Sequence, residues 1–303
     1  MRVVFEASQS PPELTEATLA AATNPLHDRS MGDLIRAVRS LSDSQIEQIA
    51  AHQRSRGMRF GEAAVDLQLA SDDDVVWALS QQFHYPYAPS ASEHGNPELV
   101  VARDPFSAPA EIIRDLCSQL TLGMAQAGEP RAALSVVSAD AGDGKTFLAA
   151  NLAVAFSQVG LRTLLIDADM RTPRLHEVFA LDSANGLSAV LAGRSNGTTI
   201  QPVPDLPSLF VMPVGMVPPN PLELLQRSAF SLLLRELLGK FDQVIVDTPA
   251  LTRGADARVI AARCGSAVAV GRKGRSRLSA MSRMIALLGQ NRTRVKGVVV
   301  NEH

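Results

Sequence analysis

Residues 133–160, ALSVVSADAGDGKTFLAANLAVAFSQVG, decide the fold because three local patterns follow one another within them. ALSVVS is a run of apolar and small residues typical of a buried strand. The loop ADAGDGKT comes next, and the remainder has the apolar spacing of a helix. A strand, a glycine-rich loop ending in Lys-Thr and a helix form the arrangement that cradles phosphate groups. The sequence therefore predicts a phosphate-binding loop.

Each part of this loop has a predicted role. Backbone N–H groups around Gly142 and Gly144, together with the helix N-terminus, would form an anion cradle. Lys145 would reach the β- and γ-phosphates of a nucleotide, and Thr146 would bind Mg²⁺. The predicted nucleotide contacts within the loop and its helix are Ala141, Gly142, Asp143, Gly144, Lys145, Thr146 and Phe147. The alternative is a glycine turn with an incidental surface lysine.

Carboxylates at the ends of two further strands argue against that alternative. The run RTLLIDADMR ends in Asp167, Asp169 and Arg171, and the run FDQVIVD ends in Asp247. The C-terminal ends of parallel strands meet at one edge of a sheet, where ligands bind. Carboxylates at that edge would need a cation, so we predict Mg²⁺ held by Thr146, Asp167 and Asp247.

Asp247 by itself has an ordinary alternative, because an Asp at the end of a strand before Thr-Pro is often only a turn former. Its combination with Lys145 favours a metal site of the kind that phosphoryl-transfer proteins use.

The rest of the C-terminal region continues the alternation of strands and helices. The expected strands are 133–138, 162–167, 209–213, 243–247, 266–271 and 296–300. They are almost continuously apolar and are separated by helical patterns, which favours a mostly parallel sheet covered on both faces. We therefore predict an α/β nucleotide-binding domain over 110–303.

The N-terminal region is organised differently. Residues 1–28 show no sustained period and are predicted to be a mobile arm. Within 29–86 a helical motif occurs twice, because Gly32, Asp43 and Gln53 recur as Gly61, Asp72 and Gln82. In each copy a Ser-Asp pair precedes an apolar helical pattern, which indicates a helix N-cap. We predict a small α-helical two-repeat domain, followed by a Pro- and Ser-rich linker over 87–109.

Composition narrows the function classes. A formal net charge of −2 and an isoelectric point near 6.3 give no sign of a nucleic-acid-binding surface. No apolar stretch has the length of a membrane span, and the first residues lack a signal-peptide pattern, so we expect a cytoplasmic protein. Cys117 and Cys264 have no partners at metal-ligand spacing and are expected to be buried small hydrophobic residues.

Three segments carry a resemblance to a known family. LLIDADMRTPRLHEVF, GLSAVLAG and MPVGMVPPNPLELLQRSAF are similar to motifs of the bacterial tyrosine kinases, which have the deviant-Walker, MinD-like form of the P-loop fold. The resemblance covers about 105–303. With its N-terminal repeat the chain looks most like the EpsG-type subgroup, the chain-length-determinant-associated kinases of exopolysaccharide loci.

The resemblance implies an activity and assigns roles to residues. It implies ATP-dependent phosphorylation of protein tyrosines, with Lys145, Asp167 and Asp169 as catalytic residues. Asp167 would act on Mg²⁺ through water, and Asp169 would be the base for the acceptor hydroxyl. Arg171 would bind phosphate or bridge the neighbouring carboxylates. Asn301 would lie near the adenine or simply cap a turn.

The resemblance also implies a partner and a location. The partner would be a transmembrane chain-length determinant, or polysaccharide co-polymerase, that holds the chain at the inner face of the cell membrane. A homo-oligomer is compatible with the family. The alternative function is an ATP-operated assembly switch, like the MinD and ParA ATPases, that gates this partner without phosphorylating tyrosine.

The chain departs from the family and its relatives at several positions. Asp140 stands where the MinD and ParA ATPases have a second lysine, which argues against the partitioning-ATPase interpretation. Cys117 replaces the last arginine of the family's E-x-x-R-x-x-R helix, which begins here with Glu111 and Arg114. No tyrosine-rich tail follows Asn301, and Tyr85 and Tyr87 are the only tyrosines. We therefore expect little self-phosphorylation.

Two weaker signals remain. The repeat domain resembles the N-terminal domain of secretion and pilus ATPases, some of which bind cyclic diguanylate. Only its second copy has the Arg-x-Gly start, at Arg59 and Gly61, so we expect no strong cyclic diguanylate binding. The basic run GRKGRSR, 271–277, is most simply a solvated loop.

Overall fold

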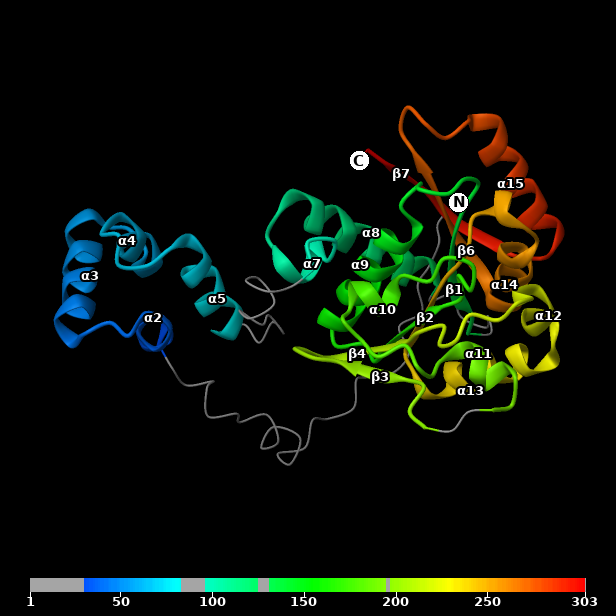
Figure 1. The fold of residues 1–303 in the computed structure, drawn as a ribbon. Helices are drawn as coiled ribbons and strands as arrows, with labels where there is room; N and C mark the ends of the chain where they lie inside the picture. The colour runs from blue at the N-terminus through cyan, green and yellow to red at the C-terminus, as the bar shows by residue number, and fades with distance from the viewer. Residues whose placement is uncertain (1–29, 83–95, 125–130, 195–196, 303) are drawn as a thin grey trace, which may run out of the picture. The chain divides into compact units, whose positions relative to one another are not determined.

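The computed structural model describes residues 30–82, 96–124, 131–194 and 197–302. The chain divides into two compact units, Met1–Tyr85 and Pro86–His303, and most of their elements are labelled in Figure 1. The predicted arm 1–28, the first part of the predicted linker, and both Tyr85 and Tyr87 lie outside the described residues.

The first unit contains two helical pairs. They are α2 (Met31–Arg39) with α3 (Asp43–Arg56), and α4 (Phe60–Asp66) with α5 (Asp72–Gln82). Helix α2 packs against α5 and α3 packs against α4, so the first helix of each repeat contacts the second helix of the other. Their shared core contains Leu34, Ile35, Ile49, Ala63 and Ala78, with Trp77 packed beside it. Two short repeats thus bury one apolar core that neither could enclose alone.

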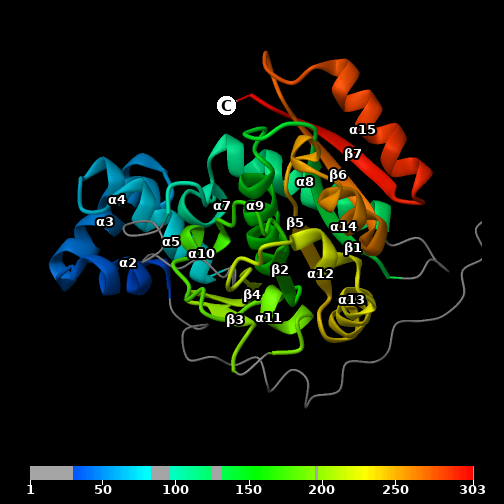
Figure 2. The same ribbon diagram turned by 45° about the vertical axis from the view of Figure 1, so that its right-hand side comes forward.

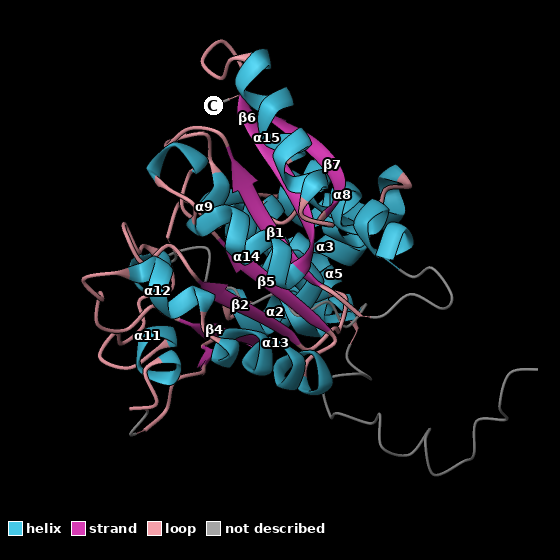
Figure 3. Cartoon of the chain, turned by 90° about the vertical axis from the view of Figure 1, so that its right-hand side faces the viewer, coloured by secondary structure: helices cyan, strands magenta, loops and turns pink. Residues whose placement is uncertain are grey.

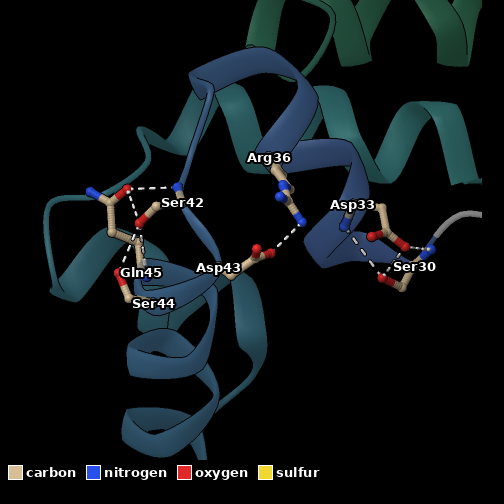
Figure 4. A network of polar contacts seen from close by, with 7 residues as sticks. All are labelled: Ser30, Asp33, Arg36, Ser42, Asp43, Ser44 and Gln45. Carbon is tan, nitrogen blue, oxygen red and sulfur yellow. Dashed lines mark hydrogen bonds and ion pairs between the residues drawn. The ribbon is translucent and has the colours of Figure 1, made fainter.

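Reciprocal hydrogen bonds stabilise the helix starts in this unit, as Figure 4 shows for α2 and α3. The Ser42 hydroxyl accepts from the Gln45 backbone N–H at 3.3 Å, and the Gln45 side chain accepts from the Ser42 N–H at 2.9 Å. Ser71 and Asp74 make the same pair of bonds at the start of α5. The predicted N-caps are therefore confirmed, and each stabilises its helix by about 1 kcal/mol.

The second unit is built on a seven-stranded sheet with the order β3-β4-β2-β5-β1-β6-β7. Its strands are β1 (Ala133–Ser138), β2 (Thr163–Asp167), β3 (Gln201–Val203), β4 (Leu206–Met212), β5 (Gln243–Asp247), β6 (Gly265–Arg272) and β7 (Arg294–Asn301). All neighbouring strands are parallel except β3 and β4, which are antiparallel. The predicted fold class and the six predicted strands are confirmed, whereas β3 was not predicted.

Helices cover both faces of this sheet (Figures 2 and 3). On one face α8 (Ala108–Met124) packs on α9 (Lys145–Gln158), which crosses the central strands. The other face carries α13 (Ser228–Lys240), α14 (Asp256–Cys264) and α15 (Leu278–Gln290). Short helices complete the layers: α10 (Leu175–Val178), α11 (Leu187–Leu191) and α12 (Pro221–Gln226). Cys117 and Cys264 are buried, as expected.

The end of the predicted linker belongs to this second unit. Helix α7 (Val100–Arg103) buries Val101 and Ala102 against the core beside α9. The buried Asn151 side chain of α9 accepts from the Val101 N–H at 3.1 Å and donates to the Glu98 carbonyl at 2.7 Å. The apolar run LVVA supplies the buried surface that a free linker lacks, so this part of the linker prediction was wrong.

Among the described residues, none of the helices combines the length and the apolar character that crossing a membrane would require.

Candidate active site

The phosphate loop joins β1 to α9, and two of its glycines give its backbone a conformation that leaves room for an anion. Gly142 and Gly144 have φ angles of 82° and 99°, in the left-handed region that other residues rarely adopt. A Cβ atom at Gly144 would also collide with the Asn301 side-chain nitrogen. Helix α9 begins at Lys145, so the first free N–H groups of the helix point toward the loop. The loop therefore has the backbone of a phosphate cradle.

The Asp143 side chain stabilises the conformation of this loop. Its side chain is fully buried and accepts hydrogen bonds from the Asp140 N–H at 3.1 Å and the Ser276 hydroxyl at 2.8 Å. The Asn301 amide donates to the Asp143 carbonyl at 3.2 Å. Asp143 therefore fastens the loop to the basic run 271–277, and its carboxylate does not face the nucleotide cavity.

Two buried carboxylates lie next to each other beside the loop. Asp167 and Asp247 are paired residues of the neighbouring strands β2 and β5. The Thr146 hydroxyl donates to the Asp247 carboxylate at 2.7 Å. Burial raises the pKa of the Asp247 carboxyl to about 6, although the bond from Thr146 and the charge of Lys145 oppose the rise. Burial and the charge of Asp247 raise the pKa of Asp167 well above its usual value.

Asp167 organises the chain that follows it. Its carboxylate accepts three backbone N–H groups, from Asp169, Arg174 and Leu175, each at 3.1 Å. These bonds consume most of its acceptor capacity and fold the segment after β2 back on itself. Asp167 and Asp247 are both buried and do not line the cavity, whereas Thr146 does, so a metal ion in the cavity would reach either carboxylate only beside Thr146.

Asp169 does reach the cavity. One carboxylate oxygen accepts the N–H groups of Arg171 and Thr172 at 3.1 and 3.0 Å, and the other accepts the Thr172 hydroxyl at 2.9 Å. Its side chain is therefore held in one orientation at the edge of the space in front of Lys145. This is the placement that the prediction of a base requires.

Arg171 lies outside that space. Its Nε donates to the carboxylate of Asp256, a residue of α14 that is only 1% exposed. This bond, rather than a contact with the cavity, fixes the position of the Arg171 side chain, and it raises the pKa of the guanidinium group. Of the two alternatives left open by the sequence, phosphate binding and a bridge between the neighbouring carboxylates, the structure shows neither, because the side chain pairs with the distant Asp256.

The cavity in front of the loop has a volume of about 730 Å³, large enough for a nucleotide. The predicted residues that line it are Ala141, Gly142, Gly144, Lys145, Thr146, Phe147, Asp169 and Asn301. Lining residues that were not predicted are Glu98, Val100, Pro109, Thr172, Arg174, Ala250, Arg253 and Arg272. Glu98 and Arg174 form an ion pair of 2.5 Å at its rim.

The cavity residues that were not predicted fall into two groups, according to whether the sequence indicated their position. Thr172 and Arg174 follow the predicted carboxylate strand, and Arg253 and Arg272 follow two other predicted strands, so the common edge of the sheet could have located them. Glu98 and Val100 had no such signal, because they come from a segment that we expected to be a linker.

Comparison with known proteins identifies the family. Residues 134–303 match the model of the CobQ/CobB/MinD/ParA nucleotide-binding domain. The chain is 32% identical over 176 residues to the tyrosine-protein kinase CpsD of Streptococcus agalactiae, a match that covers 58% of this chain and 77% of CpsD. The chain belongs to the bacterial tyrosine kinase family.

Two further kinases show how far this likeness extends. The tyrosine-protein kinase Wzc of Salmonella typhi is 34% identical over 204 residues, which are 67% of this chain but only 28% of Wzc. The solved kinase domain of the Escherichia coli tyrosine kinase ETK superposes with a TM-score of 0.64 at 32% identity, covering 68% of this chain and 79% of that domain. The chain thus spans about a quarter of Wzc, and the residues that match the family model lie in the second unit.

The site also has the donors that Mg²⁺ uses. Among the described residues no group of three or more His, Cys, Asp or Glu side chains is arranged to hold a metal ion. Mg²⁺ in phosphoryl-transfer proteins instead takes one or two protein oxygens together with substrate phosphates and water. Thr146 and Asp247 supply such oxygens, and the mutual repulsion of the buried carboxylates would be relieved by a cation.

Proposed function

We propose that this protein transfers the γ-phosphoryl group of Mg²⁺·ATP to tyrosine side chains of other proteins, in the control of exopolysaccharide chain length or export. The observation that supports it most is the position of Asp169. Its carboxylate is held by three hydrogen bonds at the wall of the cavity that Lys145 and Thr146 also line.

The loop amides and Lys145 would bind the phosphate chain of ATP, and Thr146 and Asp247 would hold the metal ion. When bound, Mg²⁺ supplies positive charge to the phosphate oxygens. Asp169 would accept the proton of the tyrosine hydroxyl as its oxygen forms a bond to the γ-phosphorus. The bond from that phosphorus to the β–γ bridging oxygen breaks, so the products are phosphotyrosine and ADP.

Membership of the kinase family supports the proposed partner. The partner would be a transmembrane chain-length determinant, and the chain would work on the cytoplasmic face of the membrane through it. The partner would then be both the anchor and a source of acceptor tyrosines. We expect no strong binding of cyclic diguanylate by the first unit, in which Arg59 is exposed at the start of α4.

The function can be tested by label transfer. Full-length protein would be incubated with Mg²⁺ and γ-labelled ATP in the presence of a detergent-solubilised membrane fraction, and the labelled amino acids identified. We expect labelled phosphotyrosine in a membrane protein, and none with Lys145→Met. Release of all label as inorganic phosphate would contradict the kinase activity and favour the ATP-operated assembly switch.

A further inference from the structure

Two arginines line the nucleotide cavity from opposite sides and have no carboxylate partner in the part of the chain that the structure describes. They are Arg253 and Arg272. Arg272 ends β6, beside β7, whereas Arg253 follows β5, beside β2. The phosphate loop follows β1, which lies between β5 and β6. Arg272 is therefore on the side of Asn301, and Arg253 is on the side of Asp169.

The backbone around Arg253 is fixed although its side chain is exposed. Arg253 ends the short helix η1 (Leu251–Arg253) directly after β5. The Thr252 N–H donates to the carbonyl of Ala139 at 3.1 Å, which attaches this turn to the start of the phosphate loop. Ala250, just before it, is buried. A long cationic side chain is thus carried to the catalytic side of the cavity on a rigid base.

The charges at this side call for a further cation during reaction. Asp169 together with a nucleoside triphosphate carries more negative charge than one divalent cation and Lys145 neutralise. Arg171 and Arg174 are already paired with Asp256 and Glu98. Negative charge on the equatorial oxygens of the transferring phosphoryl group is what arginines stabilise in other phosphoryl-transfer proteins.

We propose that Arg253 contacts the γ-phosphoryl group as it is transferred and is a catalytic residue of this site. Its planar guanidinium can offer two parallel N–H groups to two equatorial oxygens. Because Arg253 is exposed and forms no ion pair among the described residues, its movement toward the phosphoryl group breaks none. This inference rests on the ATP site of the proposed function but not on the nature of the acceptor.

Two ADP complexes separate this role from simple ATP binding. ADP with beryllium fluoride imitates bound ATP, and ADP with planar aluminium fluoride imitates the phosphoryl group in transfer. Calorimetry on the full chain with Mg²⁺ would compare both complexes for the unmodified protein and Arg253→Ala. We expect the variant to bind the aluminium fluoride complex about a hundredfold more weakly and the beryllium fluoride complex less than about threefold more weakly.

Three further variants sharpen the test. Arg253→Lys keeps the charge but not the paired donors and should recover only part of the loss. Arg272→Ala, on the other side of the cavity, should weaken both complexes by the same factor. Arg235→Ala, on the exposed face of α13, should change neither. Equal weakening of both complexes by Arg253→Ala, or no change in either, would overturn the proposal.

The same experiment also gives a separate test of the proposed function. If the unmodified chain bound neither complex, the ATP site itself would be contradicted. If it bound both but labelled no tyrosine, the kinase activity would fail while the role of Arg253 in phosphoryl transfer to water would still be measured.

Discussion

At the scale of one residue, Asp247 shows how a buried charge in a functional site lowers the stability of the folded state. Its carboxylate is 1% exposed and lies beside Asp167, and its pKa is raised to about 6. The folded state therefore binds a proton more tightly than the unfolded state. The stability that this proton contributes is complete below the normal pKa near 4, is lost as pH rises through 6, and amounts to about 3 kcal/mol at most.

We predict that Asp247→Asn stabilises the protein without nucleotide at pH 8 and weakens its stabilisation by Mg²⁺·ATP. The amide can still accept from the Thr248 N–H and can donate to the Thr146 hydroxyl, so the packing is kept. Urea unfolding with a chelator would measure this. The gain should shrink at pH 4.5, where the Asp247 carboxyl is protonated in the folded state and no longer a buried charge. A variant less stable than the unmodified protein at pH 8 would contradict this account of the site.

The site residues differ in how far sequence alone could place them. Lys145, Thr146 and Asp169 all line one cavity, because a strand end and a glycine loop determine where their side chains go. The Asp143 carboxylate, expected to contact the nucleotide, accepts from Ser276, and Arg171, expected to bind phosphate or to bridge neighbouring carboxylates, pairs with Asp256. A sequence gives the residue type at a loop position, whereas the direction of its side chain depends on partners far away in the chain.

At the scale of elements, hydrogen bonds join the phosphate loop to the loop between β6 and α15. Ser276 donates to the buried Asp143 carboxylate and accepts from the Arg272 N–H at 2.7 Å. The basic run 271–277, expected to be solvated, is therefore partly engaged, and Lys273 also pairs with Glu302. Removing the Ser276 hydroxyl would leave a buried carboxylate oxygen with one donor fewer.

Ser276→Ala should therefore weaken ATP binding about fivefold, the equivalent of about 1 kcal/mol, although Ser276 does not line the cavity. Calorimetric titration with Mg²⁺·ATP would measure the change. Ser279→Ala, at an exposed position of α15, is the matched control and should leave the affinity unchanged. Unaltered affinity in a folded Ser276→Ala protein would show that the two loops are independent.

Elements with weak local patterns were the ones not predicted. Strand β3 has three residues, one of them Pro202, and lies at the edge of the sheet where proline is tolerated. So short a segment shows no alternation. Helix α7 was not predicted because prolines and serines surround it, and the burial of Val101 and its hydrogen bond to Asn151 show that it belongs to the core.

At the scale of the whole molecule, the stability of the first unit depends on close contacts between its two repeats and on close contacts inside the second repeat. A Cβ atom at Gly61 would lie 2.5 Å from the Val75 side chain, whereas at the equivalent Gly32 it would lie 3.3 Å from the Phe60 ring. Alanine is otherwise favoured over glycine in helices by about 1 kcal/mol. The two equivalent positions therefore predict different effects on stability.

Gly61→Ala should destabilise the first unit by about 1–3 kcal/mol, whereas Gly32→Ala should be close to neutral. Hydrogen exchange of peptides from 31–82 in the full chain would report this locally, with peptides from β1 and β5 as an internal reference. Equal protection in the two variants would show that the contact at Val75 relaxes without cost.

The central claim is that one cavity binds ATP through the phosphate loop and uses Asp169 to transfer its γ-phosphoryl group to tyrosine. The most direct measurement is single-turnover formation of phosphotyrosine from γ-labelled ATP by Asp169→Asn, with bound ATP measured in the same samples. The account predicts unchanged ATP binding, because Asp169 is not part of the phosphate cradle, and at least about a hundredfold less phosphotyrosine than the unmodified protein forms. Phosphotyrosine formed at the rate of the unmodified protein would contradict it.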